Sequence, residues 1–174
     1  MMRVMHEGID FEGLVRAQRR GLEALARRLV WDAEEAKDVV QAAMAQAWTQ
    51  RAALKDAGSA PAWLRRIVVH RAMSHLRRRR VWNTFARLLL VEPEVMPAAD
   101  DDVESAEHRA RLAEALERLS PKQSTAFSLR YLEGLSIDEV ADAMAIDRGT
   151  VRVHLQRSVK ALRAEGVLPD REDA

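Results

Sequence analysis

The fold is decided by residues 119–162, which read LSPKQSTAFSLRYLEGLSIDEVADAMAIDRGTVRVHLQRSVKAL. This stretch holds three helix-start signals. At the first, Ser120 stands before Pro121 and is followed by Gln123. A hydroxyl at the N-cap, a proline at the first helical position and a glutamine three residues after the cap form a capping box with a preset backbone. The sequence therefore predicts that a helix begins at Ser120-Pro121.

Two further helices follow the same logic. Gly134 is placed to end the turn after the first helix, and Ser136 with Glu139 forms a second capping box. Asp147 is then the N-cap of a third helix. The apolar residues of this third helix fall on one stripe, which consists of Val151, Leu155, Val159 and Leu162. The stretch is thus predicted to be a helix-turn-helix.

The third helix carries basic and hydrogen-bonding residues outside its apolar stripe. These are Arg148, Thr150, Arg152, His154, Gln156, Arg157 and Lys160. Such a face suits a helix that lies in the major groove of DNA. The alternative is a helical hairpin whose polar face is only solvated, which is the usual fate of a charged helix face. Three capped helices with a short connection between the second and third favour DNA binding.

The whole chain has the composition of a helical protein. It has 174 residues, of which 48% are hydrophobic, 32% charged and 5% aromatic, with a net charge of +1. Glycine and proline are few, and cysteine is absent, which excludes disulfides, thiol sensors and cysteine-containing zinc sites. No segment reaches the roughly 20 apolar residues that cross a bilayer. We therefore expect an all-α, cytoplasmic protein.

Two opposed blocks of charge divide the chain. Residues 63–80 contain seven arginines and no acid, whereas residues 91–107 contain seven acids and no lysine or arginine. A basic block followed by an acidic, proline-interrupted one indicates a polyanion-binding module and a tether. We predict two small helical domains, at 1–90 and 106–174, joined by an acidic linker at 91–105.

The first domain is predicted to hold three helices. The first covers about residues 10–30, and Asp32 caps a second that has a broad apolar face. A loop leads to a third helix near Pro61, whose buried stripe is Leu64, Ile67, Val68, Ala72 and Leu76. Its arginines, with His70, His75 and Trp82, indicate a nucleic-acid surface. For residues 77–80 the alternative is a solvated, cationic helix end.

The order of these parts resembles an extracytoplasmic-function sigma factor, a small two-domain specificity subunit of bacterial RNA polymerase. The resemblance covers about residues 10–162. Its motifs are Ala36-x-Asp38-Val39-Val40-Gln41 with Ala47-Trp48, then Trp63-Leu64-x-x-Ile67 before the arginine run, then Leu119-Ser120-Pro121, Gly134-Leu135-Ser136, Glu139-Val140-Ala141 and Gly149-Thr150-Val151.

The resemblance implies a role for each part. The helix with Asp38, Val40, Gln41, Met44 and Trp48 is implied to bind core RNA polymerase. The residues implied to recognise and melt the minus-ten promoter element are Lys55, Asp56, Ser59, Arg65, Arg66, His70, Arg71, Ser74, Arg77 and Arg78. The third helix of the carboxy-terminal domain is implied to recognise the minus-thirty-five element, through Val153 and the basic and hydrogen-bonding residues of that helix named above. Family members are often held inactive by an anti-sigma protein, which makes such a protein a candidate partner.

The chain departs from the family pattern at four places. Ala42 replaces an acidic residue, and His70 and Ser74 stand where asparagine and aspartate are frequent. Ala145 stands where the turn before the last helix commonly has glycine. If that turn requires a positive φ, alanine costs about 1 kcal/mol there. Val153-His154 replaces a small-basic pair, which indicates a promoter preference of its own.

Three other functions compete with this interpretation. An enzyme is disfavoured because the five histidines are scattered and no HExxH or glycine-rich phosphate loop occurs. We therefore predict no catalytic residue, no cofactor and no metal site, and interpret the Asp100–Asp102 run as a solvated tether. A stand-alone helix-turn-helix regulator leaves the docking helix unexplained. A protein that only binds other proteins would leave the arginine-rich helix and the three capped helices of residues 119–162 unexplained.

Overall fold

The computed structural model describes residues 10–54, 56–88 and 103–169, and within these ranges it contains helices, turns and no strand. The first half of the chain holds α1 (Phe11–Val30), α2 (Ala33–Thr49), the turns η1 (Arg51–Ala53) and η2 (Ala57–Ser59), and α3 (Ala60–Leu88). The second half holds α4 (Val103–Arg118), α5 (Pro121–Phe127), the π-helical turn η3 (Ser128–Leu132), α6 (Ile137–Met144) and α7 (Arg148–Ala164). The all-α prediction is confirmed.

The helix ends of the first half follow the predicted caps. Helix α1 runs without interruption through Gly21 and ends at Trp31, whose φ of 61° is left-handed. The carboxylate of Asp32 then accepts a hydrogen bond of 2.7 Å from the backbone N–H of Glu35 and starts α2. Helix α3 starts beside Pro61 and buries the predicted stripe, together with Val69.

The helix-turn-helix forms where the sequence predicted it. Ser120 and Gln123 exchange hydrogen bonds of 3.3 and 3.0 Å at the start of α5, and Ser136 and Glu139 exchange bonds of 3.2 and 2.9 Å at the start of α6. Both capping boxes are therefore present. Helix α5 continues directly into the π-helical turn η3, so the first helical segment runs from Pro121 to Leu132.

The turn between α6 and α7 is left-handed at an alanine. Ala145 has φ 53° and ψ 48°, and is the C-cap of α6. The amide of Ile146 closes the turn by donating to the carbonyl of Ala141 over 3.1 Å. Ala145 therefore has the positive φ at which we expected alanine to be strained, because a residue with a Cβ occupies a conformation that favours glycine.

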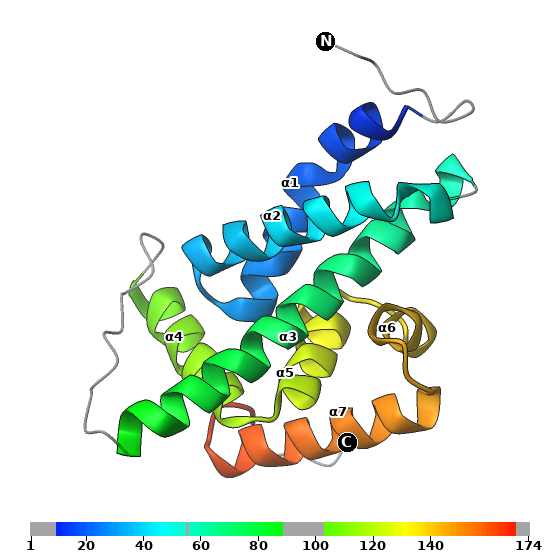
Figure 1. The fold of residues 1–174 in the computed structure, drawn as a ribbon. Helices are drawn as coiled ribbons and strands as arrows, with labels where there is room; N and C mark the ends of the chain where they lie inside the picture. The colour runs from blue at the N-terminus through cyan, green and yellow to red at the C-terminus, as the bar shows by residue number, and fades with distance from the viewer. Residues whose placement is uncertain (1–9, 55, 89–102, 170–174) are drawn as a thin grey trace.

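The two halves of the chain pack against each other. Helix α3 runs diagonally across the molecule and lies against α5 and α6, as Figure 1 shows. One hydrophobic core joins Leu64 and Val68 of α3 to Leu129, Val140 and Met144 of the second half. A smaller core holds Leu116, Phe127 and Leu162 with their neighbours. The two helical domains therefore pack against each other through a shared apolar core.

The predicted linker needs one correction. Helix α4 begins at Val103, so residues 103–105 are helical and belong to the second half. The rest of the predicted linker, residues 91–102, lies outside the described residues.

Candidate nucleic-acid and polymerase interfaces

The last helix presents the residues predicted to read DNA. Val151, Leu155 and Leu162 are buried as expected, and Ser158 joins them with its hydroxyl bonded to the carbonyl of Leu155 at 2.8 Å. Arg148, Arg152, Val153, Gln156, Arg157 and Lys160 are exposed, whereas Thr150, His154 and Val159 are half-buried. The exposed face is therefore long, and its charged members are all cationic.

Two of these residues, at the start of α7, bind carboxylates of neighbouring residues. Asp147 accepts the backbone N–H of Thr150 over 2.8 Å and also its hydroxyl, and these bonds lower the pKa of the Asp147 carboxyl. Arg148 donates to Asp138 of α6 over 3.2 Å, in a pair that is exposed on both sides. Thr150 is therefore fixed in orientation, while Arg148 can exchange its carboxylate for another anion.

His154 lies in a cationic environment that the sequence did not indicate. Burial lowers its pKa first, and the charges of Lys122 on α5 and Arg157 on α7 lower it further. A histidine so placed is neutral at neutral pH, and it offers one donor and one acceptor. Lys122 was missed because it belongs to a different helix and approaches α7 only in the folded chain.

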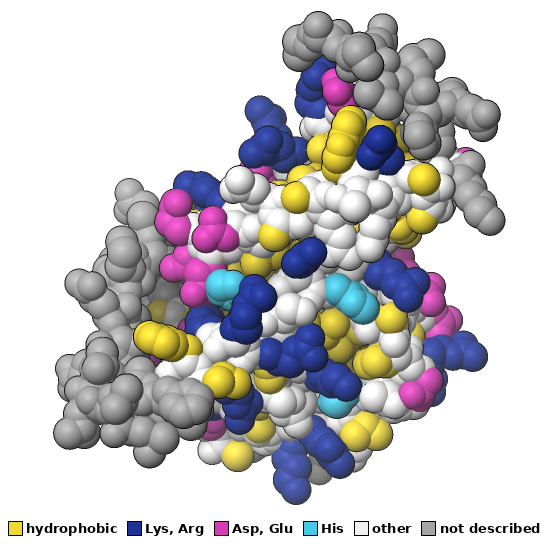
Figure 2. Space-filling view, viewed as in Figure 1, with side chains coloured by type: hydrophobic (Ala, Val, Ile, Leu, Met, Phe, Trp, Pro, Cys, Tyr) yellow, Lys and Arg dark blue, Asp and Glu magenta, His cyan; other side chains and the backbone are white. Residues whose placement is uncertain are grey.

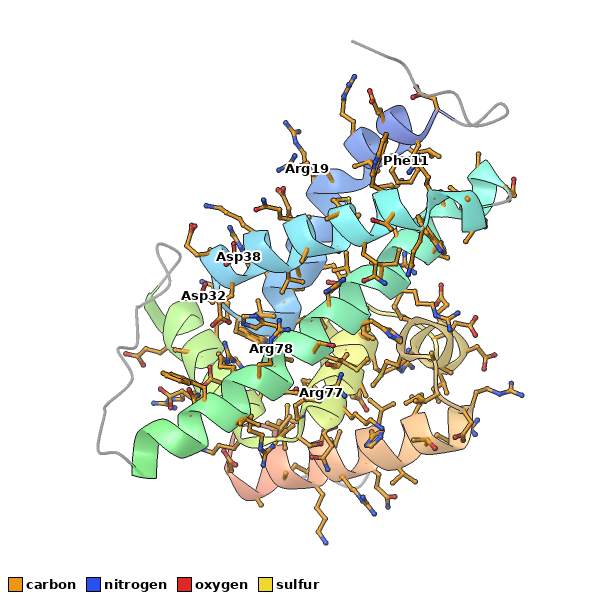
Figure 3. All side chains as sticks on the ribbon, viewed as in Figure 1. Phe11, Arg19, Asp32, Asp38, Arg77 and Arg78 are labelled. Atoms are coloured by element: carbon orange, nitrogen blue, oxygen red, sulfur yellow. The ribbon has the colours of Figure 1, made fainter. Side chains whose placement is uncertain are left out.

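Helix α3 carries a second cationic face. Arg66, His70, Arg77 and Arg78 are exposed, and Arg65, Arg71 and Ser74 are half-buried. Positions 66, 70 and 77 share one side of a helix because three, four and seven residues bring the chain back to the same face. Figure 2 shows lysine and arginine side chains gathered over α3 and α7 on the side viewed in Figure 1, and Figure 3 labels Arg77 and Arg78.

Neighbouring groups fix several side chains on this face. The Nε of Arg71 donates to Gln46 of α2 over 2.7 Å, and Arg77 donates to the hydroxyl of Ser74 over 3.1 Å. Burial lowers the pKa of His70 first, followed by the charge of Arg66, against the effect of a hydrogen bond to the backbone of Met144. Arg71 thus braces α2 against α3, and His70 touches the second half of the protein.

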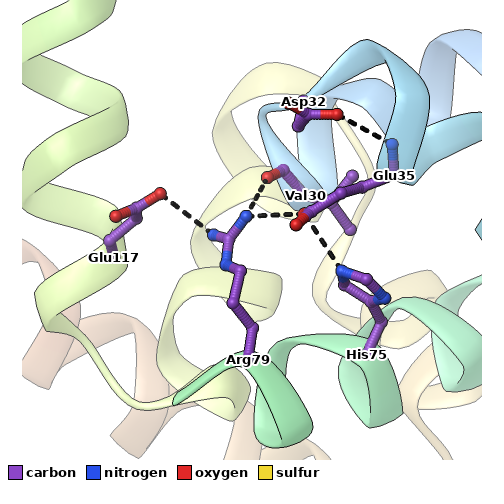
Figure 4. A network of polar contacts seen from close by, with 6 residues as sticks. All are labelled: Val30, Asp32, Glu35, His75, Arg79 and Glu117. Carbon is purple, nitrogen blue, oxygen red and sulfur yellow. Dashed lines mark hydrogen bonds and ion pairs between the residues drawn. The ribbon is translucent and has the colours of Figure 1, made fainter. Parts of the chain in front are cut away.

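The arginine run 77–80 does not act as one block. Arg79 is only 19% exposed and donates to the Val30 carbonyl over 3.0 Å, to Glu35 over 2.7 Å and to Glu117 over 3.1 Å (Figure 4). Arg80 donates to the Leu119 carbonyl over 2.8 Å. His75, which the sequence also assigned to the nucleic-acid surface, lies 3.0 Å from Glu35 in the same network. This network supports the fold, while Arg77 and Arg78 face solvent.

The loop before α3 is built by its own polar residues. Asp56 accepts the backbone N–H of Ser59 over 3.0 Å, and the Ser59 hydroxyl donates back to the Asp56 carbonyl over 2.8 Å. Both residues are exposed, so the loop presents a fixed polar turn beside the α3 N-terminus. The third predicted loop residue, Lys55, lies outside the described residues.

Helix α2 exposes a mixed face that is distinct from the cationic ones. Asp38, Gln41 and Trp48 are exposed, and Met44 is half-buried. Trp48 is 40% exposed, with the Arg51 guanidinium 4.5 Å from its ring centre and Phe11 at 5.8 Å. Val40, by contrast, is 2% exposed and belongs to the core. We therefore leave Val40 out of the docking face.

A shallow groove lies beside this face. It has a volume of about 450 Å³ and is lined by Ala42, Ala45, Gln46, Thr49, Gln50 and Arg71. Ala42 contributes only a methyl group to this lining. The sequence showed that position 42 is an alanine. It could not show the groove, which depends on how α3 packs against α2.

Comparison with known proteins identifies the family. A sigma-70 region 2 model matches residues 14–81, and a sigma-70 region 4 model matches residues 109–162. The chain is 34% identical over 168 residues to a Streptomyces coelicolor protein named RNA polymerase sigma-E factor, which covers 95% of this chain and 91% of that protein. The chain belongs to the extracytoplasmic-function sigma factors.

Two further similarities agree with this assignment. The sigma factor is 31% identical over 141 residues to the Mycobacterium tuberculosis protein named ECF RNA polymerase sigma factor SigL, covering 79% of this chain and 78% of that protein. Its fold is similar to a solved structure of the sigma factor RpoE in complex with the anti-sigma factor NepR from Bartonella quintana. That match has a TM-score of 0.67 and 22% identity, and covers 92% of this chain and 99% of the other.

The two family models divide the sigma factor as its helices do. Region 2 corresponds to α1, α2 and most of α3, and region 4 to most of α4 through α7. Within the described ranges, no helix is long and apolar enough to cross a membrane. Over those same residues, no three side chains of histidine, aspartate or glutamate gather as a metal site would require.

Proposed function

We propose that this sigma factor binds core RNA polymerase through the exposed face of α2, and directs transcription initiation and DNA melting at a two-part promoter. Helix α7 reads the minus-thirty-five element, and α3 with the loop before it reads the minus-ten element. The chain carries out no chemistry of its own, since the polymerase supplies the catalytic site. Its place is the cytoplasm, where the polymerase works.

One observation carries the proposal. Each half of the chain exposes a cationic helix, α7 with Arg152 and Arg157 and α3 with Arg66 and Arg77, while α2 exposes a face of different chemistry. Arginine is suited to guanine edges and to phosphate. A stand-alone helix-turn-helix regulator needs one such helix and no docking face. The presence of all three surfaces supports a polymerase-bound reader of two DNA elements.

Transcription reconstituted from purified core polymerase and a promoter library tests the proposal. Initiation at a defined set of promoters that depends on the sigma factor is the expected result. Tight sequence-specific binding as a free dimer, with no polymerase association, would instead favour the stand-alone regulator.

Variants of α7 test the upstream reader. Arg152→Ala or Arg157→Ala should cost about 1–3 kcal/mol of recognition if the residue reads a base edge. Arg163→Ala is the matched control, because Arg163 lies in the last turn of the same helix and its Nε binds the Pro169 carbonyl over 3.2 Å. Unchanged promoter selection in both test variants would remove them from the site.

Charge reversal on α2 tests docking. Asp38→Arg places a cation on the exposed face beside Gln41, and we expect weaker binding to core polymerase. Glu34→Arg makes the same change of charge one turn earlier, where Glu34 pairs with Lys37 over 2.5 Å. Equal losses in the two variants would show a general charge effect and argue against a specific docking face.

An anti-sigma protein is a further proposed partner. The solved structure of similar fold contains one, and the present chain leaves α2 exposed for such a protein to bind. Co-purification with a protein that blocks polymerase binding would support this partner.

A further inference from the structure

The shallow groove between α2 and α3 has the lining of a carboxylate-binding site. Gln46, Thr49 and Gln50 of α2 contribute amide and hydroxyl groups, and Arg71 of α3 contributes a guanidinium. Among the described residues of this lining there is no carboxylate to offset that charge. Because an arginine side chain stays protonated in proteins, the groove is cationic at every pH at which the chain is folded.

The guanidinium of Arg71 is held in place but not used up. Arg71 is half-buried, and its Nε donates to the Oε1 of Gln46 over 2.7 Å, while Gln46 donates to Gln50 over 3.4 Å. Among the described residues, the two terminal nitrogens of Arg71 have no hydrogen-bond or ion-pair partner. Terminal nitrogens of a guanidinium form the fork that binds a carboxylate through two parallel hydrogen bonds.

Arg71 also lies apart from the cationic side of α3. Arg66, His70 and Arg77 share one side of that helix, and each residue of an α-helix is turned about 100° from the one before it. Arg71 is therefore rotated away from His70, and its hydrogen bond to Gln46 directs it to α2. This position separates Arg71 from the residues that the proposed function assigns to DNA.

The groove continues the exposed face of α2. Asp38 and Ala42 are four residues apart, as are Gln41 and Ala45, so each pair consists of neighbours on the helix surface. Asp38 is exposed and places a negative charge about one turn from the groove, which disfavours the closely spaced phosphates of a DNA backbone. A single protein carboxylate carries one charge and is repelled less. The acidic ligand that fits here is therefore a side chain of the protein that docks on α2.

We propose that this groove binds an aspartate or glutamate side chain of core polymerase, and that Arg71 is a docking residue and not a reader of the minus-ten element. This inference rests on the proposed function, in which α2 docks on polymerase. Helix α3 then serves two partners, because Arg66 and Arg77 face DNA while Arg71 extends the docking face of α2.

Equilibrium binding of fluorescently labelled sigma factor to purified core polymerase, over a series of salt concentrations, tests the proposal. Arg71→Ala should raise the Kd about tenfold at low salt and make it less dependent on salt, because one ion pair is lost. Arg71→Lys keeps the charge without the fork and should give an intermediate Kd. Arg20→Ala removes one exposed positive charge from α1 and is the matched control, for which we expect an unchanged Kd.

Gln46→Ala separates docking from bracing. This variant removes the hydrogen bond that holds Arg71 but keeps the cation, so the Kd should rise less than about threefold, with the salt dependence of the unsubstituted protein. Thermal melting of each variant measures the loss of the brace independently. Equal losses of binding in Gln46→Ala and Arg71→Ala, with equal salt dependence, would show that Arg71 only braces the helices and would overturn the proposal.

Promoter selection at saturating sigma factor distinguishes the two partners. Holoenzyme with Arg71→Ala should select the same promoters as the unsubstituted protein, whereas Arg66→Ala should change promoter selection without changing the Kd for polymerase. An unchanged Kd for Arg71→Ala would overturn the inference, and altered promoter selection in that variant would assign Arg71 to the DNA surface. Failure of the unsubstituted chain to bind core polymerase would instead contradict the proposed function.

Discussion

Replacing Ala145 by glycine is expected to stabilise the sigma factor. Ala145 is exposed and has φ 53° and ψ 48°. For a residue with a Cβ, this conformation costs about 1–2 kcal/mol relative to the right-handed region. Glycine removes that strain but adds about 0.4–1 kcal/mol of conformational entropy to the unfolded chain. The difference predicts that Ala145→Gly raises the free energy of unfolding by about 0.5–1 kcal/mol.

Denaturation measures this gain directly. For a chain of 174 residues, 1 kcal/mol corresponds to a shift in Tm of about 2–4 °C, so Ala145→Gly should raise Tm by about 1–4 °C. Urea unfolding should show a higher midpoint with an unchanged slope, because the substitution exposes no new surface. The turn keeps its hydrogen bond from Ile146 to Ala141, since glycine retains the backbone.

Two glycines of the same chain provide the controls. Gly134 has φ +70° and open space within 4 Å of the place that a Cβ would take, so Gly134→Ala isolates the backbone cost and should lower stability by about 0.5–1 kcal/mol. Gly21 lies inside α1, also with free space, so Gly21→Ala should raise stability by about 0.5–1 kcal/mol. If both controls behave as expected while Ala145→Gly is neutral or destabilising, the strain argument is refuted.

Three further predictions concern the polar groups of the fold. Burial and nearby cations lower the folded-state pKa of His70 and His154 below 6.5, so the unfolded chain binds protons more readily in that window, and the free energy of unfolding should fall as pH drops through about 6.5. His154→Gln should reduce that slope in urea titrations at about pH 7.5 and 5.5, and an unchanged slope would exclude His154 as a source. Arg79→Ala should lose about 2–3 kcal/mol by removing the donor that the Val30 carbonyl, Glu35 and Glu117 share, whereas Arg78→Ala should change stability by less than about 0.5 kcal/mol; equal values would contradict the bracing role. Ser120→Ala should cost about 1 kcal/mol in the same assay through loss of the α5 N-cap, and no loss would contradict the capping geometry.

The helix-turn-helix could be predicted from the sequence because its signals are local. Each capping partner lies three residues from its cap, as at Ser120 and Gln123, so the capping pattern does not depend on contacts with distant segments of the chain. The buried stripe of α7 was predicted for the same reason, although Ser158 replaced Val159 at its centre. Helical periodicity gives the direction of a side chain to within about one residue.

The division of the arginine run could not be predicted. Arg77 to Arg80 are identical side chains on consecutive positions, and neither propensity nor charge separates them. Their roles depend on groups that other segments bring, such as the Val30 carbonyl 49 residues away and Glu117 38 residues away from Arg79. Val40 shows the opposite case. Its burial follows from the spacing of Ala36, Val40, Ala43 and Ala47, which a motif match does not reveal.

Opposite charges join the two halves of the chain, in addition to the shared apolar core. Carboxylates of the second half face arginines of the first: Glu117 and Glu133 reach Arg79 and Arg28, and Glu139 lies within the field of Arg65. The first two pairs join residues that are 38 and 105 positions apart. Neither helical periodicity nor local charge patterning can pair residues so distant, and only the packing of the helices brings them together.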